Sequence, residues 1–143
     1  MATYFGSSIN DSPTIVLSAG DKLENARGIA LAVKDGVAVK PEAGAHVIGI
    51  SLIETDEMVE KGMDIDIQVK DIGKWTAGEE ITAGTELAAD AEGRAVAAKA
   101  GDFILGVALG NASEAGTWMK VQIINVAALL CSPVITLVAC HRI

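Results

Sequence analysis

Hydrophobic and polar residues alternate along parts of this chain with the period of two that is typical of β-strands. The clearest case is residues 63–69, where four apolar residues would face one side and three polar residues the other. The apolar set is Met63, Ile65, Ile67 and Val69, and the polar set is Asp64, Asp66 and Gln68. A sustained helical period over eleven or more residues is absent from the sequence. The pattern therefore predicts a nearly all-β chain with half-buried strands.

Two strand-like segments carry a glycine near their middle, where the lack of a side chain normally weakens a strand. They are residues 43–52, AGAHVIGISL, with Gly49, and residues 100–109, AGDFILGVAL, with Gly106. Both faces of each segment are apolar or small, so we expect both faces to be covered. Gly49 and Gly106 are therefore predicted to be structural glycines, at which another backbone approaches closely.

These two segments belong to a longer internal repeat. Residues 33–52 match residues 90–109 without a gap, and residues 62–69 match residues 116–123 after a loss of three positions. A connection that changes length between two copies indicates a surface loop. The Asp35-Gly36 pair in the first copy is a strong hairpin signal. We predict one compact β-sandwich or barrel, jelly-roll-like, built from two sequence-related halves at 26–69 and 83–123.

Two segments flank the β domain, which we place at residues 26–124. Residues 1–25 are expected to form an extended N-terminal arm. Residues 125–143 are expected to form an apolar strand or tail that packs on the core or on a neighbouring subunit. The apolar stretch 126–140 is interrupted by Ser132-Pro133 and is shorter than the roughly 20 residues of a membrane-spanning helix. It is therefore interpreted as two short β segments, and no membrane partner is expected.

The composition restricts the class of partner. Half of the 143 residues are hydrophobic, but only 3% are aromatic, which leaves few rings for stacking bases or sugars. The formal net charge of −8 would repel a phosphate backbone, so no nucleic-acid partner is expected. Cys131 and Cys140 have the spacing of neither a zinc site nor a redox pair. The N-terminus lacks the pattern of a signal peptide, which favours synthesis and retention in the cytoplasm.

Clusters of acidic residues give little support for catalysis or metal binding. Asp64, Asp66 and Asp71 could be imagined as calcium ligands. No EF-hand spacing accompanies them, so a solvated strand face is the favoured interpretation. Glu79 and Glu80 could be an acid–base pair, but adjacent strand residues point to opposite faces.

The histidines and tryptophans are also expected to be structural. His46 is interpreted as a partly buried residue at the edge of the core, and no fixed neighbour is assigned to His141. Trp75 and Trp118 are interpreted as core or interface residues. No catalytic residue, cofactor site or metal site is therefore predicted.

The segment 75–123 contains a pattern of turns and small residues that reads AGE.I.AG..L..D..G followed by G..ILGVAL..A..G....VQ. Its residues here are Ala77-Gly78-Glu79, Ala83-Gly84, Leu87, Asp90, Gly93 and Gly106-Val107-Ala108-Leu109. In these residues the sequence resembles the small capsid cement, or head decoration, proteins of tailed bacteriophages. The first copy of the repeat matches more loosely, so the resemblance covers about residues 26–124.

The resemblance implies a structural virion protein and not an enzyme. Such a protein binds the outer surface of an assembled capsid and stabilises it by bridging neighbouring major capsid subunits. The implied partners are the major capsid protein and further copies of this chain, as a dimer or trimer. The implied location is the outer capsid surface of the virion, after synthesis in the host cytoplasm. The flanking segments are the expected contacts with capsid or subunits, through Tyr4, Phe5, Ile9, Ile15, Val134, Ile135 and Leu137.

A second class of function stays open, namely a small β-rich module that binds a ligand or glycan and is displayed on the virion. Such a module would need a concave site lined by aromatic residues. The chain offers two Trp, one Tyr and two Phe for this purpose.

Overall fold

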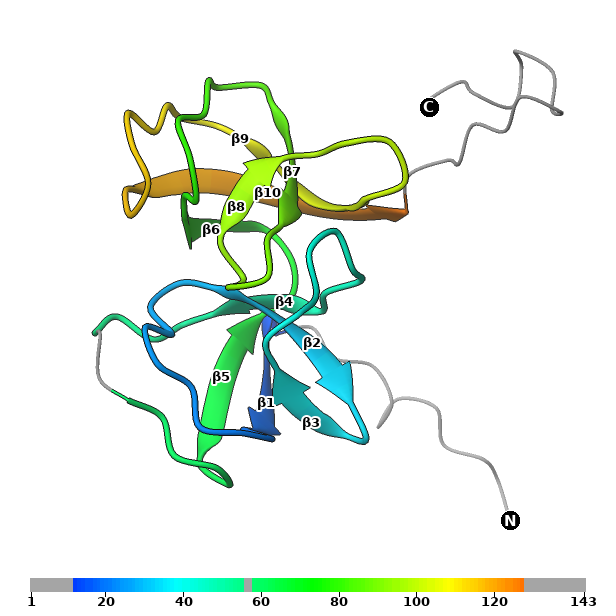
Figure 1. The fold of residues 1–143 in the computed structure, drawn as a ribbon, viewed down its shortest axis with the longest axis vertical. Helices are drawn as coiled ribbons and strands as arrows, with labels where there is room; N and C mark the ends of the chain where they lie inside the picture. The colour runs from blue at the N-terminus through cyan, green and yellow to red at the C-terminus, as the bar shows by residue number, and fades with distance from the viewer. Residues whose placement is uncertain (1–11, 56–57, 128–143) are drawn as a thin grey trace, which may run out of the picture.

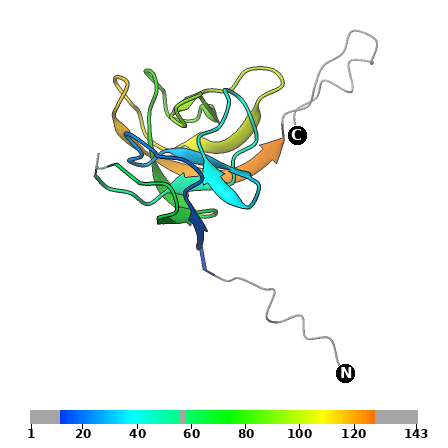
Figure 2. The ribbon, with the colours of Figure 1, turned by 60° about the horizontal axis from the view of Figure 1, so that its bottom comes forward.

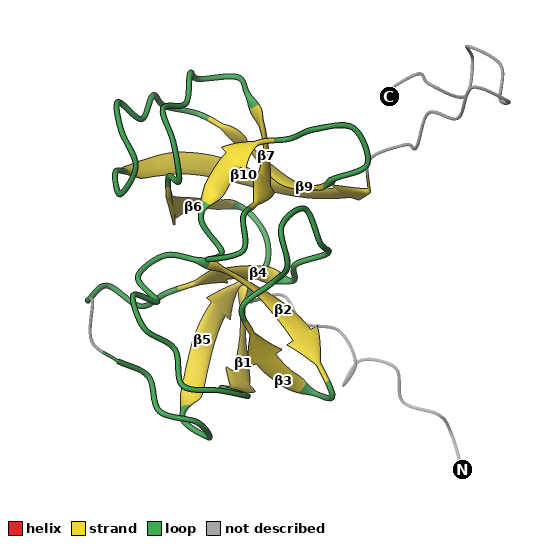
Figure 3. Ribbon diagram, viewed as in Figure 1, coloured by secondary structure: helices red, strands yellow, loops and turns green. Residues whose placement is uncertain are grey.

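A computed structural model describes residues 12–55 and 58–127, and this part of the chain contains ten strands and no helix (Figures 1 and 3). The strands are β1 (Thr14–Ser18), β2 (Ala30–Lys34), β3 (Val37–Val39), β4 (Gly49–Ser51), β5 (Asp64–Gln68), β6 (Ile72–Thr76), β7 (Glu86–Ala89), β8 (Ala95–Ala97), β9 (Phe103–Ala108) and β10 (Trp118–Ala127). The prediction of an all-β chain is confirmed.

Each half of the chain forms one five-stranded antiparallel sheet. The strand order is β1-β5-β4-β2-β3 in the first sheet and β6-β10-β9-β7-β8 in the second, so both halves have the same topology. The first sheet lies below the second in Figure 1 and in front of it in Figure 2. The arrangement is sandwich-like, as predicted. The sequence relatedness of the halves stays a prediction with which the equal topology agrees.

Each sheet closes on itself through a parallel bridge between its two outermost strands. Ala19, directly after β1, bridges Ala38 in β3, and Ala77, directly after β6, bridges Ala95 in β8. A backbone hydrogen bond accompanies each bridge. The nitrogen of Gly20 donates to the carbonyl oxygen of Ala38 at 2.8 Å, and the nitrogen of Gly78 donates to that of Ala95 at 2.7 Å. The bridges curl each sheet into a small barrel with its own interior.

Two clusters of buried apolar side chains fill these interiors. The first cluster lies within the first half and consists of Ala19, Leu23, Ala26, Ile29, Leu31, Ala38, Val59, Ile65 and Ile67. The second cluster fills the second half, and Trp75 is its largest fully buried side chain. It also includes Ala30, Val47 and Ile50 of the first half. The two halves therefore share a core across their junction.

The turn between β2 and β3 forms as its sequence predicts. Asp35 has a φ of 53° and Gly36 a φ of 80°, and both values lie in the left-handed region. Two consecutive left-handed residues are typical of the type I′ hairpin turn, whose twist matches that of the flanking strands.

Gly49 in β4 and Gly106 in β9 each face the backbone of the neighbouring strand. A Cβ atom added at Gly106 would lie 2.6 Å from the carbonyl oxygen of Gln122 in β10. A Cβ atom added at Gly49 would overlap the carbonyl oxygen of Gln68 in β5. Because the obstacle is backbone, a larger residue at either position would have to push two paired strands apart.

Ser51 is the buried polar side chain of the described core. Its hydroxyl donates a hydrogen bond of 2.6 Å to the carbonyl oxygen of Ala26 and accepts one of 3.1 Å from the backbone nitrogen of Ile29. The side chain thereby ties the segment before β2 to β4 and satisfies two backbone groups that have no access to water.

The segment 14–25 differs from the expected N-terminal arm. Residues 14–18 form β1, which pairs with β5 along its whole length, from Thr14 opposite Gln68 to Ser18 opposite Asp64. Leu23, a few residues later, is buried in the first core. These residues therefore belong to the first barrel. Residues 1–11 lie outside the described part of the chain.

Two expectations about single side chains are corrected. Met63 was expected on the buried face with Ile65, but it is 51% exposed because β5 begins only at Asp64. His46 was expected to be partly buried, but it is exposed. Its ring packs against that of Phe103, with the ring centroids 4.4 Å apart.

Replacing Gly106 by valine is expected to lower the free energy of unfolding by about 3 kcal/mol, the upper part of the usual range for overpacking. The backbone of β10 blocks the new side chain, and it moves less easily than a side chain would. Denaturant unfolding followed by circular dichroism measures the change. Gly110→Ala is the matched control, because a Cβ atom there meets nothing within 4 Å. Equal stability of the two variants would contradict the close approach at Gly106.

Replacing Ser51 by alanine is expected to lower the free energy of unfolding by about 1–3 kcal/mol, the range for a buried polar group left without its partner. The carbonyl of Ala26 and the N–H of Ile29 would lose the hydroxyl in a region without water. The same unfolding measurement applies. Ser113→Ala, at an exposed position, should change stability by less than about 0.5 kcal/mol. A Ser51 variant as stable as this control would contradict the role of the hydroxyl.

Candidate functional site

The expected contact residues fall mostly outside the described part of the chain. This applies to Tyr4, Phe5, Ile9, Val134, Ile135 and Leu137. Ile15, the remaining one, lies in β1 and is half-buried against the first core. Only part of its side chain is therefore accessible to a partner. The structure brings none of these residues together in the region that it describes.

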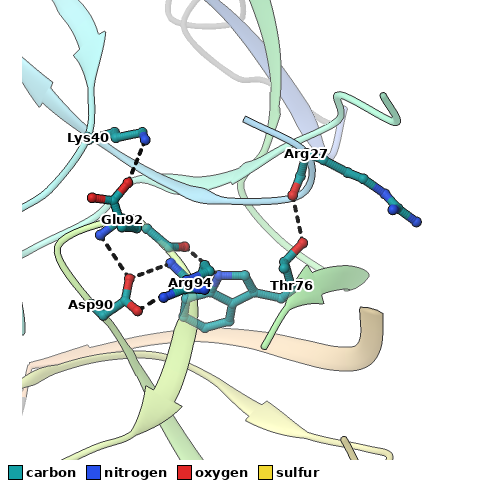
Figure 4. Close-up of polar contacts among 8 residues, drawn as sticks. Arg27, Lys40, Thr76, Asp90, Glu92 and Arg94 are labelled. Atoms are coloured by element: carbon teal, nitrogen blue, oxygen red, sulfur yellow. Dashed lines mark hydrogen bonds and ion pairs between the residues drawn. The ribbon is translucent and has the colours of Figure 1, made fainter. Parts of the chain in front are cut away.

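A band of polar contacts joins the two halves at their junction (Figure 4). The carbonyl oxygen of Gly93 accepts hydrogen bonds from the backbone nitrogen of Ala30 at 2.7 Å and from Nε1 of Trp75 at 2.8 Å. Thr76 Oγ1 donates a hydrogen bond of 2.6 Å to the carbonyl oxygen of Arg27. Gly93 has a φ of 80° and approaches the backbone of Ala30 closely, so both its conformation and its surroundings require glycine.

Charged residues of the β7–β8 turn extend this junction. Lys40 Nζ lies 2.7 Å from Glu92 Oε2, and this hydrogen bond, together with the positive charge, lowers the pKa of Glu92. The carboxylate of Asp90 accepts hydrogen bonds of 2.9 Å from the backbone nitrogens of Glu92 and Arg94. Asp90 Oδ2 also lies 3.4 Å from Arg94 Nε. These charges hold the turn and connect it to the first half.

A groove of about 380 Å³ opens where the outer faces of the two sheets meet. Leu52, which is 44% exposed, and Ile72, which is 57% exposed, form part of its apolar wall. Glu54 and Lys74 contribute charges of opposite sign, and Trp118 completes the lining on the side of the second sheet. Sequence analysis missed this groove because its residues come from segments that are far apart in the chain.

Trp118 stands beside two cations. The guanidinium carbon of Arg27 lies 4.0 Å from the centroid of the indole ring, and Lys74 Nζ lies 5.3 Å from it. Both distances are in the range of cation–π interactions. The ring is therefore engaged within the protein and is not a free platform for a sugar or a base. In the predicted repeat, Trp118 corresponds to Asp64, and this change of residue type is the sequence signal that could have revealed the site.

The described residues contain no group of three or more His, Cys, Asp or Glu side chains that could hold a metal ion. Asp64 and Asp66 are exposed on β5. Glu79 Oε1 accepts a hydrogen bond of 2.9 Å from the backbone nitrogen of Ala97, which gives it a structural contact. Cys131, Cys140 and His141 lie outside the described residues. Across residues 12–55 and 58–127, no helix is long and apolar enough to span a membrane.

Comparison with known proteins identifies the family. A family model described as phage cement protein matches residues 14–123. A search of curated protein sequences finds no match. Among solved structures, the crystal structure of head fiber gp8.5 N base in bacteriophage phi29 is similar, with a TM-score of 0.58 and 18% sequence identity. The alignment covers 80% of this chain and 95% of that chain, and at this identity it shows a shared fold.

The match to the family model begins at the first residue of β1 and ends within β10, so it spans both barrels. This extent agrees with the structure, in which residues 14–25 belong to the first sheet. The chain belongs to the phage cement protein family and is a structural protein of the phage virion.

Proposed function

We propose that this protein binds the outer surface of the assembled phage capsid and stabilises it by bridging neighbouring major capsid subunits. The observation that carries the proposal is the match to the phage cement family over both barrels. The similar phi29 structure is described as the base of a head fiber, which supports attachment to a phage head. The proposed site of action is the exterior of the virion, and the protein is proposed to act without catalysis.

The physical properties of the chain suit this role. Each sheet closes on itself, so long open strand edges that would pair with other copies in solution are reduced. The net charge of −8 opposes non-specific aggregation of the free protein. On a capsid, many identical sites lie side by side, and multivalent attachment makes a strong single contact unnecessary.

We assign the capsid contacts to the segments that flank the barrels. They contain the apolar residues Tyr4, Phe5, Ile9, Val134, Ile135 and Leu137, which lie outside the described part of the chain. Apolar side chains gain affinity for a partner surface from the apolar area that they bury there. Ile15 is left out of this set because it packs against the first core.

Purified protein mixed with undecorated heads of its phage is expected to sediment with them until the sites on the heads are saturated. Heads with bound protein should also release DNA at a higher temperature than undecorated heads, because bridged capsid subunits separate less easily. Sedimentation and a DNA-dye melting assay measure the two effects. Failure to sediment with the heads, together with saturable binding to a glycan, would support the ligand-binding alternative and overturn the proposal.

Deleting residues 1–11 is expected to weaken head binding by at least about tenfold, or roughly 1.4 kcal/mol. The deletion leaves Ser12 in place, which hydrogen-bonds Thr14 at the start of β1, so the unfolding temperature should not change. A deletion of residues 128–143 tests the other flank in the same assay. Unchanged head binding in both deletion variants would refute the assignment of the contacts to the flanks.

A further inference from the structure

The outer faces of the two sheets carry charges of opposite sign. In the first sheet, Asp64 and Asp66 are exposed on β5. In the second sheet, Lys120 takes the position on β10 that corresponds to Asp66, and it stands directly across from Lys74 on β6. One barrel thus presents two carboxylates on its outer face and the other two ammonium groups. Of these, Asp66 and Lys120 occupy corresponding positions, whereas Asp64 corresponds to Trp118.

None of these four charges is neutralised by an ion pair within the described chain. The ion pairs at the junction, Lys40 with Glu92 and Arg94 with Asp90, use none of these four charges. Asp64 accepts a hydrogen bond from the Ser18 hydroxyl, and Lys74 lies near the ring of Trp118. The four charged groups therefore remain available to a partner. We call them, with the groove between them, the bipolar surface.

Exposed apolar residues connect the acidic and basic parts of the bipolar surface. Val16, which is 56% exposed, stands opposite Asp66 in the β1–β5 ladder. The backbone of Leu52 hydrogen-bonds that of Asp66, and Leu52 lines the groove together with Ile72 and Lys74. The acidic face of the first sheet, the groove with its mixed lining and the basic face that begins at Lys74 thus follow one another across the junction.

We infer that the bipolar surface is an interface between two copies of this chain. In a two-fold arrangement the same patch serves on both subunits, so each acidic face meets the partner's basic face. A partner with charge of one sign would be repelled by one of the two faces. A second copy matches both faces at once, with like charges kept apart, which is the usual basis of electrostatic specificity.

The test uses two charge-reversal variants of the full chain. In the first variant Asp64 and Asp66 are replaced by lysine, and in the second Lys74 and Lys120 are replaced by glutamate. Sedimentation equilibrium at about 0.15 M salt measures self-association, because the Debye length of about 8 Å there screens the overall repulsion but not contact pairs. Native protein is expected to form dimers, and each variant alone should dissociate at least about tenfold more readily.

An equal mixture of the two variants is expected to restore association, because every contact then pairs a lysine with an acid. Two matched controls carry the same changes of charge away from the bipolar surface. They are Glu42→Lys with Glu114→Lys, and Lys34→Glu with Lys99→Glu, all at exposed positions. The controls should associate like native protein, and circular dichroism should show that all variants fold.

Several outcomes would overturn the inference. They are native protein that stays monomeric at all concentrations, single variants that still associate, and a mixture that does not. If native protein is monomeric and the variants lose binding to phage heads, the bipolar surface belongs to the capsid contact instead. Head sedimentation of native protein is measured separately, so failure of this inference is distinguishable from failure of the proposed capsid binding.

Discussion

The close approach of paired backbones inside each barrel is the constraint on which the rest of the structure depends. A sheet of only five strands closes when its strands curve strongly, and strong curvature brings backbone atoms together on the concave side. Gly49 and Gly106 provide the space at this point, since the carbonyl oxygens of Gln68 and Gln122 stand where a Cβ atom would lie. Closure also buries the apolar faces of all five strands in one interior, with no need for a covering helix.

The junction adds a second constraint, because neither barrel is complete without the other. Ile50 lies on the face of β4 that points away from the first core, and the second half covers it. Trp75 in turn satisfies its indole N–H through the carbonyl of Gly93, which also binds Ala30 of the first half. Shared apolar contacts and shared hydrogen bonds therefore join the barrels. Independent hinge motion of the halves would expose both kinds of contact to water.

Sequence patterns predicted the parts of the fold that rest on local chemistry. The alternation at 63–69 indicated β5, and the Asp35-Gly36 pair indicated the β2–β3 hairpin. The strand β1 was missed because TIVLS at 14–18 has no residue identical to the one at the aligned position of IGKWT at 72–76, the strand in the corresponding place. The groove around Trp118 was missed for a different reason. It depends on the angle and contact between two sheets, which no local pattern encodes.

Buried and exposed positions differ in how well the two halves keep the same residue type. Ala38 and Ala95 are both fully buried at the bridges that close the barrels, and both halves use the same small residue there. On the outer faces the residue types differ, since Asp66 corresponds to Lys120. A topology used twice thus keeps its interior and varies its exterior. Opposite charges on corresponding faces give one chain two different surfaces with the same shape, and such surfaces can recognise each other across two subunits.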